Sequence, residues 1–141
     1  MFKTILVALD NSELSERIIQ ALKEFQLQPE TKVVLAHVIS PAESGLEGPA
    51  DLPYSDPKLG LYPHIQHQLQ IYQAALPYEA ELEIVTGDPA EEIVRLANIH
   101  YASLIIIGSR GLTGLNRILQ GSVSSQVVTD APCSVLVVKP G

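Results

Sequence analysis

Apolar runs and amphipathic stretches alternate along this chain. Strand-like segments rich in branched apolar residues occur at residues 4–9, 32–39, 80–85, 103–108 and 134–138. Apolar residues at helical spacing occupy the intervals between them, at residues 14–25, 64–76, 87–100 and 121–131. Strands that alternate with helices in this way predict a doubly wound α/β fold with a parallel sheet. The segment 80–85 alternates polar with apolar residues, which predicts a strand at the sheet edge.

Two breaks in the pattern are informative. Residues 40–63 are rich in proline and glycine and have no sustained period, which predicts a long, mobile loop. Residues 87–100 open with Asp88, Pro89 and Glu91, the order expected of an N-cap, a first-turn proline and a capping box. A helix is therefore predicted to start directly after Asp88.

Composition narrows the class of protein. A chain of 141 residues with 46% hydrophobic content fits one folded domain. A net charge of −7 argues against a nucleic-acid partner, which would require clustered basic residues. No apolar run approaches the length of a membrane span, and the first residues lack a signal-peptide pattern, so we expect a cytoplasmic protein without a membrane partner. The single cysteine, Cys133, excludes an internal disulfide and is expected to be a small buried side chain.

A glycine-rich stretch follows the predicted strand at 103–108. Gly108, Gly111, Gly121 and Ser122 match neither the spacing of the dinucleotide fingerprint nor the phosphate-binding loop with its lysine. Gly121 and Ser122 open a predicted helix, whose free N–H groups and positive dipole end suit a phosphate. The alternative is that these glycines only turn the chain from strand to helix.

Charge is unevenly placed around that stretch. Residues 93–129 contain no aspartate or glutamate and carry Arg95, Arg110 and Arg117. This positive region within an acidic chain would reduce the repulsion that a triphosphate meets. Arg110 is the residue we expect to bind a phosphate through its forked guanidinium.

Motifs at both ends of the chain resemble the universal stress protein family. "GSRGLTGLNRILQGSVSSQVV" fills the family's G-x2-G-x9-G-[ST] pattern, which is found in its ATP-binding members. "TILVALDNSELS" and "VVLAHVI" are similar to the first two strands of the family. The resemblance spans nearly the whole chain and implies a five-stranded parallel sheet of order 3-2-1-4-5 with four helices.

The resemblance also implies a ligand and a set of contacts. The ligand is an adenine nucleotide (ATP, or ADP or AMP), with Mg²⁺ as a companion ion, and two chains would pair through the last strand, Ser134 to Val138. The implied nucleotide contacts are Asp10 at ribose and adenine, the Val38 backbone at adenine, Ile107 and Gly108 at the strand end, and Gly111, Gly121, Ser122 and Val123 at the phosphates. Asn11 stands where the family commonly has glycine, and Gly114 is an additional glycine.

Several residues have plainer interpretations. An alternative for Asp10 is a role as a helix cap and nothing more. Ser15 lies near the predicted nucleotide site, but no base in the sequence pairs with it to make it a nucleophile. His64 and His67 are expected to be exposed helix residues without a metal, and His37 a hydrogen-bonded core residue. No catalytic residue is assigned. The sequence favours a nucleotide-holding stress-response module, and a slow ATPase or phosphotransferase and a nucleotide-free interaction module stay as alternatives.

Overall fold

A sheet of five parallel strands forms the centre of the computed structural model, which describes residues 2–10, 13–40, 57–109 and 122–139. The strands are β1 (Thr4–Ala8), β2 (Lys32–Ile39), β3 (Glu81–Thr86), β4 (Leu104–Gly108) and β5 (Ser134–Val138). Their order is β3-β2-β1-β4-β5, and all four pairings are parallel. The predicted fold class and strand order are therefore confirmed. The strand with the alternating pattern, β3, does lie at an edge.

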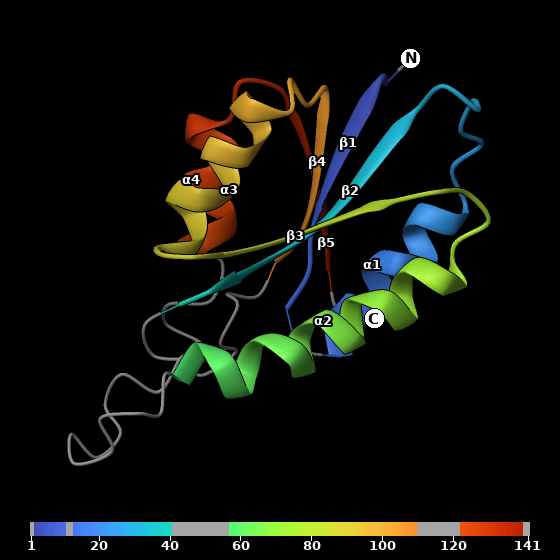
Figure 1. The fold of residues 1–141 in the computed structure, drawn as a ribbon. Coiled ribbons are helices and arrows are strands. Elements are labelled where there is room, and N and C mark those ends of the chain that lie inside the picture. The colour runs from blue at the N-terminus through green and yellow to red at the C-terminus, as the bar shows by residue number, and fades with distance from the viewer. Residues whose placement is uncertain (1, 11–12, 41–56, 110–121, 140–141) are drawn as a thin grey trace, which may run out of the picture.

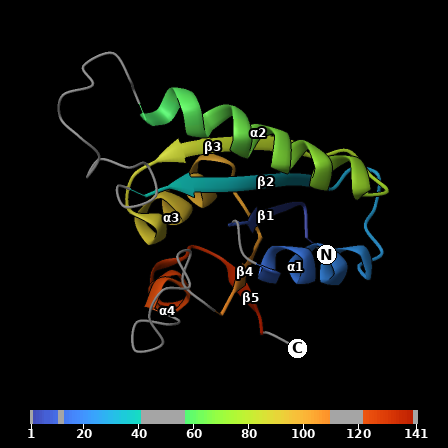
Figure 2. The same cartoon turned by 90° about the horizontal axis from the view of Figure 1, so that it is seen from below.

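Two pairs of helices cover the two faces of the sheet (Figures 1 and 2). The helices are α1 (Glu13–Lys23), α2 (Pro57–Ala75), α3 (Pro89–Ile99) and α4 (Ser122–Asp130). Ile5 and Val7 of β1 pack in the core below α1 and α2, whereas Leu6 and Ala8 pack in the core below α3 and α4. Each strand thus supplies both cores through the alternation of its side chains. None of the described helices is long and apolar enough to cross a membrane.

The start of α2 corrects one prediction. The helix begins at Pro57 and continues through Pro63, so residues 57–63 are helical and do not belong to the predicted loop. Residues 41–56 of that loop lie outside the described part of the chain. Proline suits the first turn of a helix, where its missing N–H has no partner to lose. Pro63 removes one backbone hydrogen bond, a cost that the buried stripe of the same helix offsets. That stripe was predicted, and it consists of Ile65, Leu69, Tyr72 and Leu76, each no more than 9% exposed.

The predicted start of α3 is confirmed. The Asp88 carboxylate accepts a hydrogen bond from the Glu91 N–H at 3.0 Å, and Pro89 occupies the first turn. This cap fixes where the chain leaves β3 and crosses to the opposite face of the sheet. The return strand, β4, then lies beside β1.

Candidate functional site

At the carboxyl edge of the sheet the chain leaves β1 toward α1, on one face, and leaves β4 in the direction of α4, on the other face. β1 pairs with β2 on one side and with β4 on the other. Ala8 is level with Ala36, and Val7 is level with Ile106, so the carboxyl ends of these three strands meet at one edge. In a doubly wound sheet this switch point is where ligands bind. Of the predicted contacts, Asp10, Val38, Ile107 and Gly108 lie at these strand ends.

Buried polar side chains gather at this edge. Five polar or charged residues in the described part of the chain are less than 9% exposed, namely Asp10, Ser15, His37, Ser40 and Ser124. Each lies at the carboxyl end of β1 or β2 or in the first turn of α1 or α4. Burial of a polar group costs free energy unless it is hydrogen-bonded. The cores that support the other end of the strands are apolar, so this edge is the chemically distinct part of the interior.

Asp10 is held in place by Ser15. The Asp10 N–H donates to Ser15 Oγ at 3.0 Å. The Ser15 hydroxyl lies against the Asp10 carbonyl oxygen, to which it donates, and is 3.1 Å from Asp10 Oδ1. Ser15 is fully buried and Asp10 is 7% exposed. One side chain in the first turn of α1 thus fixes both the backbone and the carboxylate that follow β1.

The sequence places Ser15 near the predicted site, and the structure adds its role as the hydrogen-bond partner of Asp10. Its signal is a hydroxyl group on the otherwise apolar inner side of α1, between Leu14 and Ile18. The sequence gives no sign that Ser40 and Ser124 are buried, because neither serine belongs to a recognisable motif. Only the packing shows that both are buried at the same edge.

His37 is a hydrogen-bonded core residue, as predicted. It is 1% exposed, and its Nδ1 lies 3.0 Å from the carbonyl oxygen of Leu9. Leu9 directly precedes Asp10, and its N–H donates to the carbonyl oxygen of Ala36 at 2.8 Å. Both the N–H and the carbonyl oxygen of Leu9 are therefore hydrogen-bonded to residues of β2, which fixes the backbone directly before Asp10.

Gly108 has a packing reason to be glycine. A Cβ atom built at this position would lie 2.4 Å from Cδ2 and 2.9 Å from Cγ of Leu14. Leu14 is itself buried at the start of α1. The side-chain direction at Gly108 is therefore occupied by α1, and packing alone requires a glycine here, while a contact of the Gly108 backbone with a nucleotide stays a prediction. The glycine lets α1 pack closely onto the end of β4, and this brings Ser15 and Asp10 to the edge.

The other predicted nucleotide contacts lie partly in the described residues and partly outside them. Val38 and Ile107 are 1% and 2% exposed, and their side chains belong to the core below α3 and α4, with Val123 packed against it. Ser122 is the first residue of α4. Arg110, Gly111 and Gly121 lie outside the described residues, so their roles stay predictions.

The predicted positive region is smaller than its arginine count suggested. Arg95 donates from Nε and Nη2 to Glu92 Oε1, at 3.0 and 2.7 Å. This hydrogen bond, and the charge of Glu92, raise the pKa of Arg95 above its ordinary value. Glu92 lies just outside the acid-free window of residues 93–129 but one helical turn from Arg95. Arg95 is therefore paired locally and is not available as one of three free cations.

Two other groups do not join the edge. His64 and His67 are exposed on α2, and the described residues contain no group of three or more His, Cys, Asp or Glu that could hold a metal. Cys133 is partly buried beside the core below α3 and α4, and this burial raises the pKa of its thiol. We expected a buried side chain, and the structure shows that the burial of Cys133 is only partial.

The fold and the switch-point edge define a doubly wound α/β protein with buried polar side chains at the carboxyl edge of its sheet. The model of the universal stress protein family matches residues 1–139, and the chain belongs to that family.

Solved relatives agree with this assignment. Universal stress protein MJ0577 of Methanocaldococcus jannaschii has a structure to which this chain is similar with a TM-score of 0.83 and 32% identity, covering 100% of this chain and 98% of that one. A universal stress protein solved in complex with cAMP has a TM-score of 0.69 at 23% identity and covers 98% and 97% of the two chains. An Arabidopsis thaliana family protein solved with AMP bound has a TM-score of 0.61 at 22% identity and covers 99% and 92%.

Proposed function

We propose that this universal stress protein binds an adenine nucleotide, with ATP as the working ligand, at the carboxyl edge of β1, β2 and β4, and acts as a nucleotide-dependent stress-response module. The observation that carries the proposal is the buried Asp10 carboxylate at the switch point, fixed by Ser15. A carboxylate held in one orientation is suited to accept hydrogen bonds from the two hydroxyls of a ribose.

The relatives support the adenine nucleotide as the ligand class. The proteins solved with cAMP and with AMP share an adenosine and differ in the phosphate, and both have the fold of this chain. In our proposal the backbone at Val38 meets the adenine edge, and the end of β4 at Ile107 and Gly108 forms the opposite side of the site.

Phosphates are assigned to the start of α4. Ser122 is the first residue of that helix, where unpaired N–H groups favour an anion. We place the phosphates between this terminus, Gly121 and Gly111, with Arg110 as the cation. Mg²⁺ would be held mainly by phosphate oxygens, because the described residues offer no cluster of three ligands and Mg²⁺ commonly binds through one or two carboxylates and the substrate.

The first experiment is mass spectrometry of the protein as purified under native conditions, followed by calorimetry with ATP, AMP and adenosine. We expect a retained adenine nucleotide or, after its removal, saturable binding of ATP. Asp10→Asn should weaken all three ligands, whereas Ser122→Ala should weaken ATP more than adenosine. Glu16→Gln, on the exposed side of α1, is the matched control and should change neither. No binding of any adenine nucleotide would overturn the proposal and leave a nucleotide-free interaction module.

We propose further that two copies pair through β5. This strand ends the sheet, and Val135, Leu136 and Val137 are only half-buried. An apolar edge strand presents unpaired backbone groups that a second copy can satisfy across a two-fold axis. Size-exclusion chromatography with light scattering should give twice the mass of 15.3 kDa at micromolar concentration. A monomer with and without ATP would contradict the pairing.

A further inference from the structure

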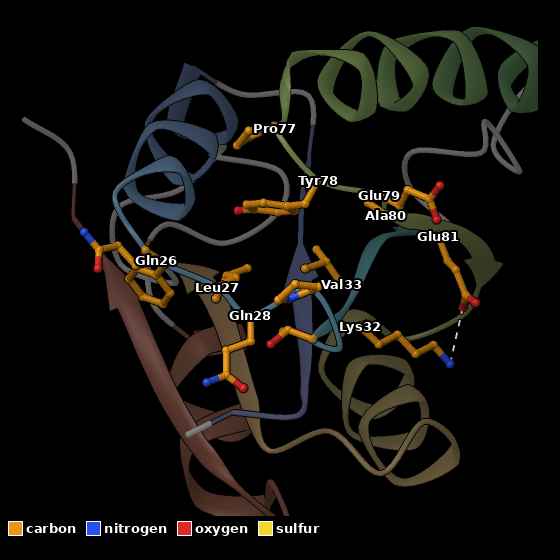
Figure 3. A pocket seen from close by; sticks show the side chains of 13 residues that line it. Gln26, Leu27, Gln28, Lys32, Val33, Pro77, Tyr78, Glu79, Ala80 and Glu81 are labelled. Atoms are coloured by element: carbon orange, nitrogen blue, oxygen red, sulfur yellow. Dashed lines mark ion pairs between the residues drawn. The ribbon is translucent and has the colours of Figure 1, made fainter.

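A pocket lies at the amino edge of the sheet, at the opposite end of the strands from the proposed nucleotide site (Figure 3). Its volume is about 720 Å³, within the range of sites for small organic ligands. Two connections form its walls: residues 25–31, which join α1 to β2, and residues 77–80, which join α2 to β3. β2 has eight residues, so the two edges are about 23 Å apart at 3.3 Å per residue.

The middle of the pocket is apolar and aromatic. Tyr78 projects from one wall toward Leu27 on the other, with Val33 close to both in Figure 3. The Tyr78 hydroxyl donates to the carbonyl oxygen of Leu22 at 3.0 Å, which fixes the ring. Partial burial raises the pKa of Tyr78 to about 12. Phe25 adds a second, half-buried ring to the lining. A flat apolar group can therefore lie against preformed ring surfaces.

The charges of the lining are on one side. Figure 3 shows Glu79, Glu81 and Lys32 on one side of Tyr78, and Gln26 and Gln28 on the other. Glu79 is exposed, and none of the described residues forms an ion pair with it.

Lys32 is already engaged at this rim. Its Nζ lies 3.4 Å from Glu81 Oε2 and 3.1 Å from Nδ1 of His100. An ammonium group only donates, so Nδ1 accepts and the opposite nitrogen of His100 donates to Glu83 Oε2 at 2.7 Å. Lys32, the one cation among the described lining residues, is thus engaged by the Glu81 carboxylate and the His100 imidazole, and the rim stays acidic.

We propose that this pocket binds a small aromatic amine, with the ring between Tyr78 and Leu27 and the ammonium group beside Glu79. The apolar middle accounts for the ring, and the acidic rim accounts for the cation. An anionic ligand would meet Glu79 and Glu81 with no free cation to compensate. A nucleotide is disfavoured in this pocket for the same reason, and the pocket lies at the other end of the strands, so the inference stands apart from the proposed function.

Amide NMR titration with tryptamine tests the inference on the full chain. Indole-3-propionate, which has the same ring and the opposite charge, and neutral 3-methylindole are the matched ligands. Tryptamine should shift the signals of residues 25–33 and 77–81 at millimolar concentration, and indole-3-propionate should bind at least about threefold more weakly, the size of effect expected for a solvent-exposed charge pair. ATP should shift a different set, near Asp10 and Gly108.

Two variants separate charge from ring. Glu79→Gln should weaken tryptamine about threefold and leave 3-methylindole unchanged. Leu27→Ala should weaken both ligands, and Glu91→Gln on exposed α3 is the control that should weaken neither. Equal affinity for tryptamine and indole-3-propionate, or no shifts at residues 25–33 and 77–81, would overturn the inference. The amide spectrum also shows whether a variant is folded. If a variant does not fold, the comparison of tryptamine with indole-3-propionate on the parent chain still tests the inference.

Discussion

The two edges of the sheet use polar groups in opposite ways. At the carboxyl edge Asp10, Ser15 and His37 are buried and bonded to neighbouring groups of the chain. At the amino edge Lys32 and Glu81 pair across a partly exposed rim above an open pocket. Buried groups need fixed partners, because an unsatisfied one is costly, whereas exposed charges keep water as an alternative. In our proposals the carboxyl edge therefore holds an oriented ligand, and the amino edge makes a looser contact.

The largest effect is expected where α1 packs onto the carboxyl edge. Gly108→Ala should lower the free energy of unfolding by about 2–3 kcal/mol, because the new Cβ overlaps Leu14 in a packed core. Urea unfolding followed by circular dichroism measures this loss. The double variant Gly108→Ala/Leu14→Ala should be less destabilised than the sum of the two single changes, by about 1 kcal/mol or more. Additive losses would show that the destabilisation by Gly108→Ala does not come from overlap with Leu14.

Next in size is the loss of the Ser15 hydroxyl. Ser15→Ala leaves the buried N–H and carbonyl group of Asp10 without that partner, which should cost about 1–3 kcal/mol of stability. The same change should weaken adenosine and ATP equally in calorimetry, since it removes the Ser15 contact with the carboxylate assigned to the ribose. Glu16→Ala, the exposed next residue, serves as the control. An unchanged affinity would separate Asp10 from nucleotide binding even if stability falls.

The amino edge should respond to alkaline pH through Tyr78. Its pKa is raised from 10.0 to about 12 by burial, so folding favours the neutral phenol. The stabilisation is complete below pH 10, the unfolded value, and is lost as the pH rises toward 12. Absorbance titration should show a late ionisation step, and Tyr78→Phe should remove it. A late step that persists in Tyr78→Phe, or none in the parent chain, would contradict the burial of this ring.

The smallest effect is expected at Arg95. Its pair with Glu92 is exposed and competes with water, so Arg95→Ala should barely move the unfolding curve. The same variant should leave the affinity for ATP unchanged, while Arg110→Ala should lower it. A comparable loss in both variants, measured side by side by calorimetry, would restore Arg95 to the predicted phosphate environment.

Much of the fold follows from local patterns. The apolar runs of β2 and β5 fix strands at residues 32–39 and 134–138, the same bounds as in the structure. The cap at Asp88 fixes the start of α3 for an equally local reason. The start of α2 could not be predicted in this way, because proline and glycine before residue 64 obscure the period. There the burial of the helix stripe outweighs local preference.

Charge and glycine were harder to interpret from spacing alone. The window of residues 93–129 ends next to Glu92, and only the helical turn shows that Glu92 neutralises Arg95. Gly108 fits the ligand motif, but its neighbour in space is Leu14, which is 94 positions earlier in the chain and has no sequence signal pointing to Gly108.

The succession of strands and helices, the family and the position of Asp10 at a strand end can be derived from the residues alone, because each depends on periodicity or on residues close in the chain. The contact of Ser15 with Asp10, the packing of α1 beside Gly108 and the pocket at the amino edge emerge only in the folded chain. Those features arise where segments distant in the chain pack together, and packing depends on shape and burial that no local pattern records.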